Sequence, residues 1–162
     1  MNENINLINF VDLALDEKKM ILSWRNHLSV KQWMYGINDI TLENHLAFIE
    51  SLKNSKDKLY FVVKQDDQYT GVIDFTELNN SEIYFGLYAN PNAKIAGIGR
   101  VLEKVSIDYA FNVLKKDTLK LEVFSENIQV RNLHKKFKFR ETGTKIINNK
   151  EVICMELKNE NR

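Results

Sequence analysis

The sequence predicts a protein of the α+β class, and three observations support this fold class. Segments with alternating apolar residues occur in groups, so several strands follow one another without an intervening helix. Four longer segments have apolar residues at the spacing of one helix face. The 162 residues, of which 44% are hydrophobic and 28% charged, are enough for a single domain with a core, spanning residues 1–162.

The N-terminal half contains four of the predicted strands and two of the predicted helices. We expect a strand at residues 5–10 and a helix at residues 16–27, where apolar residues recur at helical spacing. Thr41 can cap a second helix, which runs to about residue 54. Three strands are then predicted, the first two joined as a hairpin, at residues 59–64, 69–76 and 82–89.

The C-terminal half begins with residues 98–116, which form the clearest predicted helix because apolar residues recur along a single face. A strand at 119–124 and a helix at 128–137 follow. The last two strands, at 139–147 and 150–158, form a hairpin. The resulting order βααβββαβαββ differs from the regular alternation of strand and helix in a parallel sheet.

Composition excludes several classes of function. The net charge of +1 gives no global field for nucleic acid or a membrane surface. The single cysteine, Cys154, excludes an internal disulfide and a multi-cysteine metal site, and we interpret it as a half-buried thiol on a strand. The N-terminus lacks the features of a signal peptide. We therefore expect a cytoplasmic protein without metal, nucleic acid or membrane partners.

The turn before the clearest helix is the most informative segment. It reads Lys94-Ile95-Ala96-Gly97-Ile98-Gly99-Arg100 and follows an alternating strand. The first amides of a helix lack internal partners, the helix dipole adds positive charge, and glycine allows close approach. This arrangement predicts a pyrophosphate site. The alternative is an ordinary glycine-containing turn.

This turn resembles that of the GNAT acetyltransferase superfamily, Arg/Gln-x-x-Gly-x-Gly/Ala. Lys94 stands at its first position and keeps the positive charge. A helix that begins at Asn127 after the fifth strand, and the terminal hairpin, also match the family's order. The resemblance implies the GNAT fold, with a central mixed, mostly antiparallel sheet of about seven strands and about four helices. It also implies acetyl-CoA as the donor.

The resemblance further implies where acetyl-CoA binds. The strand that ends at residue 89 would separate from residues 119–124 and leave backbone groups free for pantetheine. An amide near Leu87 or Tyr88 would face the thioester oxygen. The expected cofactor-binding residues are Leu87, Tyr88, Ala89, Lys94, Ile95, Ala96, Gly97, Ile98, Gly99, Arg100, Asn127, Asn132 and Lys135.

Other segments indicate a narrower resemblance. Trp24-Arg25-Asn26-His27, Trp33-Met34-Tyr35 and the segment 41–50 are similar to the acetyltransferases of bacterial pseudaminic acid biosynthesis. That family acetylates the 4-amino group of UDP-4-amino-4,6-dideoxy-N-acetyl-β-L-altrosamine, on the route to a sugar that decorates flagellin. The resemblance implies a nucleotide-sugar acceptor and the possibility of a homodimer. The expected acceptor contacts are Arg25, Trp33, Tyr35, His45, Asp74, Thr76 and Tyr88.

Candidate catalytic residues follow from the same resemblance. His134 occupies the position at which the family often has a tyrosine that protonates the CoA thiolate, and an imidazole can do the same. Its alternative is a polar residue on a basic helix face. Glu77 is our first choice for the base that deprotonates the amine, with Asp74 and His45 as further candidates. The alternatives are a solvated turn carboxylate for Glu77 and a residue bordering the core for His45.

Arg25 has two interpretations, a contact with the UDP diphosphate and a salt bridge to Asp16 or Glu50. We expect the amine to attack the thioester directly, without an acetyl-enzyme. Two other functions remain open. One is an N-terminal protein acetyltransferase like the ribosomal-protein enzymes, which share the Arg-Asn pair. The other is a non-catalytic acetyl-CoA-binding module, because His134 replaces the tyrosine.

Overall fold

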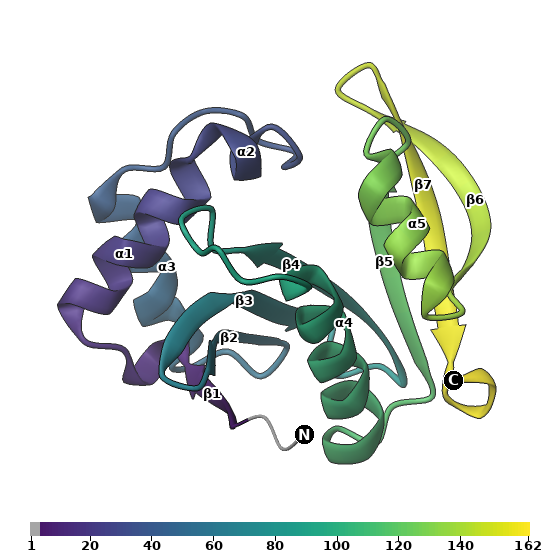
Figure 1. Ribbon diagram of the computed structural model, residues 1–162, viewed down its shortest axis with the longest axis horizontal. Coiled ribbons are helices and arrows are strands. Elements are labelled where there is room, and N and C mark those ends of the chain that lie inside the picture. Colours follow the sequence, from purple (N-terminus) through teal and green to yellow (C-terminus); the bar gives the residue numbers. More distant parts are fainter. Residues whose placement is uncertain (1–3) are drawn as a thin grey trace.

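A seven-stranded sheet with helices on both faces forms the centre of the computed structural model, which describes residues 4–162 (Figure 1). The strand order is β1-β2-β3-β4-β5-β7-β6. The strands are β1 (Ile5–Asn9), β2 (Lys58–Gln65), β3 (Gln68–Thr76), β4 (Glu82–Ala89), β5 (Thr118–Phe124), β6 (Arg140–Ile147) and β7 (Lys150–Lys158). The helices are α1 (Leu15–Asn26), α2 (Leu28–Lys31), α3 (Leu42–Leu52), α4 (Ile98–Asp108) and α5 (Ile128–Lys136).

The predicted α+β order is confirmed, with two differences in the helices. The first helix ends at Asn26, and His27, whose backbone is extended, caps the additional single-turn helix α2; its Nδ1 accepts a hydrogen bond from the Ser29 amide at 3.1 Å. The predicted helix over residues 98–116 is regular only to Asp108, and a π-helical turn, Tyr109–Val113, follows it. No helix within residues 4–162 has the length and apolar character to cross a membrane.

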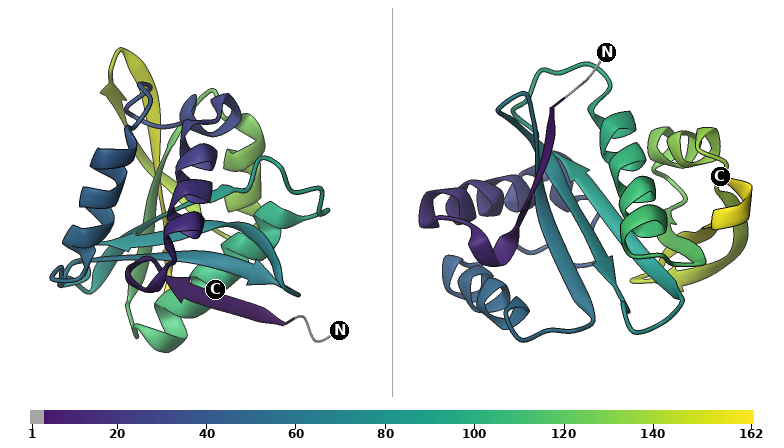
Figure 2. Two further views of the ribbon diagram at one scale, coloured as in Figure 1. Left: turned by 90° about the vertical axis from the view of Figure 1, so that its left-hand side faces the viewer. Right: turned by 90° about the horizontal axis from the view of Figure 1, so that it is seen from below.

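Two apolar clusters hold the helices on opposite faces of β1–β4. On one face, α1 and α3 bury Trp24 and Ile49 against Val62 and Val72 of β2 and β3. On the other face, α4 buries Leu102 in a larger cluster that also extends to β5 and β7. Figure 2 shows the two helix layers with the strands between them.

The sheet opens between β4 and β5. Within residues 4–162, all strand pairs are antiparallel except this one, which is parallel and contains only Glu82↔Thr118, Ile83↔Leu119 and Tyr84↔Lys120. Beyond Tyr84 the two strands diverge, as the resemblance implied, and Figure 1 shows the separation. The C-terminal residues of β4 therefore have no strand partner on their β5 side.

Gly71 on β3 allows the close packing of α4 over the sheet. A Cβ atom there would lie 2.4 Å from the Tyr88 carbonyl oxygen and 2.7 Å from Leu102 Cδ1.

We therefore expect Gly71→Ala to lower the free energy of unfolding by about 1–3 kcal/mol, as overpacking typically does. Urea denaturation measures this loss. Gly143→Ala, which would meet no atom within 4 Å, is the matched control, and equal losses in both variants would contradict the expectation.

Candidate active site

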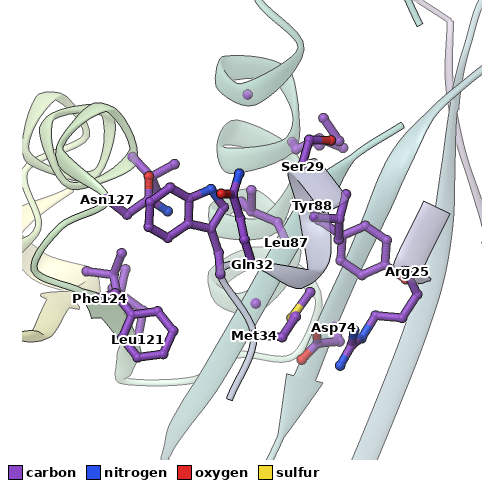
Figure 3. A pocket seen from close by; sticks show the side chains of 18 of the residues that line it. Arg25, Ser29, Gln32, Met34, Asp74, Leu87, Tyr88, Leu121, Phe124 and Asn127 are labelled. Atoms are coloured by element: carbon purple, nitrogen blue, oxygen red, sulfur yellow. The ribbon is translucent and has the colours of Figure 1, made fainter. Parts of the chain in front are cut away.

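A cavity of about 1000 Å³ occupies the opening between β4 and β5. Its walls come from the separated ends of these strands, the N-terminal part of α5, β2 and β3, and the segment that joins α1 to α3. Figure 3 shows side chains from these elements pointing into one space. The opening of the sheet thus creates a site that is lined by residues distant in sequence.

The predicted pyrophosphate turn lies beside this cavity at the start of α4. Gly97 precedes the helix with φ 75° and ψ 20°, a left-handed conformation that favours glycine. A Cβ at Gly99 would lie 3.1 Å from Leu133 Cδ2, so α5 packs closely against the first turn of α4. Gly99 lines the cavity, whereas Lys94, Ala96 and Arg100 are exposed. The free amides at the start of α4 therefore lie next to the cavity.

The structure brings together some of the predicted cofactor contacts and separates others. Leu87, Tyr88, Ala89 and Asn127 all line the cavity with Gly99. Ile98 is a buried core residue, and Ile95 packs against the same cluster. Asn132 and Lys135 are exposed on α5 and do not line the cavity, and Lys135 forms an ion pair of 3.2 Å with Glu141.

His134 on α5 is buried at the cavity wall and contacts a carboxylate that the sequence did not indicate. Its Nδ1 lies 2.6 Å from Oε1 of Glu103 on α4. Lys135 and Lys136 are exposed, while only 5% of the surface of His134 is accessible. The basic helix face of the alternative interpretation is therefore present at Lys135 and Lys136, but the ring of His134 itself is buried.

Arg25, Tyr60, Asp74 and Tyr88 form the wall of the cavity under α1 and α3 (Figure 3 shows three of them). Burial raises the pKa of Asp74 from 3.8 to about 7. The carboxylate lies over Gly86, where a Cβ would come within 2.9 Å of Oδ2. Burial also raises the pKa values of both tyrosines, which therefore remain hydrogen-bond donors.

Arg25 has hydrogen-bonding capacity left in this wall. Its Nη2 donates to the Gly36 carbonyl oxygen at 3.3 Å, and its Nη1 is buried without a hydrogen-bond partner. Among residues 4–162, no carboxylate lies within salt-bridge distance of Arg25. The proposed salt bridge to Asp16 or Glu50 is therefore absent, and a guanidinium nitrogen is free for a ligand.

His45 and Glu77 occupy different surroundings from those expected of a base. The Nε2–H of His45 donates to the Lys18 carbonyl oxygen at 2.8 Å, and burial lowers the pKa of the ring. His45 borders the cavity but also holds α3 to α1. Glu77 lies in an exposed turn with φ 60° and does not line the main cavity. The geometry therefore favours Asp74 over our first choice, Glu77.

A loop crosses the open side of the sheet. We call residues 33–35 the bridging segment, because the Tyr35 hydroxyl donates to Glu122 Oε1 on β5 at 2.5 Å. The Tyr35 carbonyl accepts a hydrogen bond of 2.9 Å from Asn148 at the tip of the β6–β7 hairpin. Trp33 is 36% exposed and lines the main cavity. The bridging segment thus connects the two halves of the opened sheet.

A second cavity of about 490 Å³ lies against the bridging segment. Thr76 and Glu77 line this cavity together with Trp33 and Tyr35. Glu122 lines both cavities and forms an ion pair with Lys145 in addition to its bond with Tyr35. Sequence reasoning did not select Glu122. Strand alternation was an available signal, because Glu122 lies between residues of β5 that face the core and therefore points to the opposite face of the sheet.

Comparisons with known proteins agree with this geometry. The model of the acetyltransferase (GNAT) family matches residues 23–139. Acetyltransferase PseH of Campylobacter jejuni subsp. jejuni serotype O:2 is 43% identical over 135 residues, which are 83% of this chain and 84% of that protein.

Solved structures agree as well. The crystal structure of Campylobacter jejuni N-acetyltransferase PseH in complex with acetyl coenzyme A has a TM-score of 0.79 and 34% identity, covering 96% of this chain and 99% of the other. A spermidine N-acetyltransferase from Vibrio cholerae has a TM-score of 0.85 at 18% identity, over 98% of this chain and 96% of that one. That likeness shows the fold alone.

Replacing Asp74 should change the pH dependence of stability. Between pH 3.8 and about 7 the unfolded chain has lost the proton that the folded protein still holds. The free energy of unfolding therefore falls as the pH rises through this range. Asp74→Asn lacks this contribution. The melting temperature of the variant minus that of the parent should therefore increase from pH 4 to pH 8.

Thermal unfolding of both proteins at several pH values measures this difference in melting temperature. Glu77→Gln, which changes an exposed turn carboxylate, is the control and should follow the parent. A constant difference between Asp74→Asn and the parent at every pH would contradict the raised pKa of Asp74.

Proposed function

Because the chain belongs to the GNAT family of acetyltransferases, we propose that it acetylates the 4-amino group of UDP-4-amino-4,6-dideoxy-N-acetyl-β-L-altrosamine in the cytoplasm. Acetyl-CoA is the donor, as in the PseH complex. The observation that carries the acceptor assignment is the 43% identity to PseH across 83% of the chain. This step belongs to pseudaminic acid biosynthesis.

The donor would use the features that surround the opened sheet. The amides at the start of α4 bind its pyrophosphate, aided by the helix dipole. Pantetheine lies between β4 and β5, where backbone groups of β4 lack a strand partner on that side. An amide near Leu87 or Tyr88 then stabilises the oxyanion of the tetrahedral intermediate.

The acceptor would bind to the wall under α1 and α3. The free Nη1 of Arg25 is suited to a diphosphate oxygen, because guanidinium–phosphate hydrogen bonds are charge-assisted. The hydroxyls of Tyr60 and Tyr88 line the same wall and can donate to sugar oxygens. Trp33 offers an aromatic face for the uracil or sugar ring.

The reaction would need one base and one acid. Asp74, in its ionised form, accepts a proton from the sugar ammonium, and the amine attacks the thioester carbon. The C–S bond then breaks, the sulfur receives a proton from His134, and the nitrogen releases its second proton to water as the amide forms. Cys154 is half-buried on β7 and lines neither cavity, which supports direct attack without an acetyl-enzyme.

An acceptor screen tests the proposed function. We expect CoA release from acetyl-CoA when the purified protein meets the UDP-amino sugar, and none with ribosomal-protein N-terminal peptides or polyamines. Release with the peptides alone would instead identify an N-terminal protein acetyltransferase. Binding of acetyl-CoA in calorimetry without CoA release from any amine would identify a non-catalytic module.

Asp74 should dominate the pH dependence of the reaction. Since a base must be ionised, the parent rate should rise with pH through about 7. Asp74→Asn should lower kcat by about 10²–10⁴-fold, the usual contribution of general base catalysis. Steady-state kinetics between pH 5 and pH 9 provide the measurement.

Glu122→Gln and Glu77→Gln are matched controls, because each converts a nearby carboxylate into an amide. Glu122 is engaged by Tyr35 and Lys145, and Glu77 lies in an exposed turn. Both variants should retain kcat within about tenfold, since neither removes the base. A larger loss in either variant, with an active Asp74→Asn, would assign the base to that residue instead.

A further inference from the structure

A fully buried carboxylate lies behind the cavity wall, next to His134. Glu103 is 0% exposed on α4, and its Oε1 lies 2.6 Å from His134 Nδ1. Among residues 4–162 it has no lysine or arginine partner within 4.0 Å, and its Oε2 has no hydrogen-bond partner. Burying a carboxylate costs free energy unless it is paired. His134 is therefore the group that compensates for Glu103.

The surroundings fix the orientation of the imidazole. Phe85 and Phe139 flank the ring, with centroid distances of 6.1 Å and 5.7 Å. Because Nδ1 is bonded to Glu103, Nε2 is the ring nitrogen left for exchange with the cavity that His134 lines. A carboxylate hydrogen-bonded to Nδ1 fixes the orientation of the ring and therefore the direction in which Nε2 points.

We infer that Glu103 is the positioning residue that holds the His134 ring so that its Nε2–H points at the sulfur of the leaving CoA. This inference rests on the proposed function, in which His134 is the acid. As the C–S bond breaks, its electron pair goes to sulfur, which takes the proton from Nε2. The ring remains bonded to Glu103 through Nδ1 and regains a proton from water. Glu103 itself touches neither substrate.

A purely structural role for Glu103 leads to different expectations. The pair is enclosed by α4, α5 and the aromatic rings of the larger cluster. Replacing a buried ionic pair by neutral groups of similar size is often neutral for stability or stabilising. Folding stability alone therefore does not explain the pair of Glu103 and His134, whereas positioning of the acid at the cavity wall does.

The first test examines the pair in the free protein and does not depend on the acceptor. The chain has three histidines, so ¹⁵N NMR of the imidazoles is tractable, and His134→Gln identifies the signals of His134. We expect a hydrogen on Nδ1 of His134 in the parent. A His134 ring that carries its hydrogen only on Nε2 would overturn the inference, whichever amine the enzyme acetylates.

The second test measures catalysis by Glu103→Gln, which keeps the shape and removes the charge. Its kcat should fall about ten- to a hundredfold, less than the loss of a whole acid–base group, with an unchanged KM for acetyl-CoA. Asp108→Asn, an exposed carboxylate on the same helix, is the control and should match the parent.

A double-mutant cycle separates positioning from folding. In a His134→Tyr background the acid no longer needs Glu103, so Glu103→Gln should change kcat by less than about twofold. Equal losses in both backgrounds would show a structural role and overturn the inference, as would a parental kcat in Glu103→Gln. If the parent releases no CoA with the UDP-amino sugar, the proposed acceptor is wrong, and the cycle is repeated with the amine that the screen identifies.

Discussion

The short parallel pairing of β4 with β5 is the constraint on which the rest of the structure depends. It ends after Tyr84↔Lys120, while the antiparallel pairs on either side continue. Backbone groups in a sheet normally satisfy one another, so a pair that stops early leaves hydrogen-bonding groups that need another partner. Acetyl-CoA can provide that partner, and the cavity exists because the two strands do not close over it. In the proposed complex, the donor rather than the chain completes the sheet.

The cost of this opening appears in the polar groups around the cavity. Asp74 has a pKa raised by burial, Arg25 has an unpartnered nitrogen, and Glu103 has an unpartnered oxygen. Each of these groups is less stable than it would be in water or in a complete ion pair. They lie on elements held rigidly by the two apolar clusters, so they cannot relax away from the cavity. Unsatisfied groups concentrated around one cavity are typical of a site that is prepared for ligands.

Much of this arrangement could be predicted from the sequence, but some contacts could not. Local patterns predicted the seven strands and the turn around Gly97, and the resemblance implied the opened sheet. The pair formed by Glu103 and His134 joins residues 31 positions apart, and no local pattern marks which face of α4 meets α5. Likewise, Asp74 and Glu77 are near neighbours in sequence. Only the pairing of β3 with β4 determines that Asp74 lies in the cavity and Glu77 in a turn.

The bridging segment has a consequence for how the two substrates influence each other. Through Tyr35 it is bonded both to Glu122 on β5, which borders the proposed donor site, and to Asn148 on the terminal hairpin. A ligand that displaces this segment must break those bonds. If one substrate does so, the affinities of the two proposed sites become thermodynamically linked, and the linkage is reciprocal: the first substrate changes the affinity for the second by the same factor by which the second changes the affinity for the first.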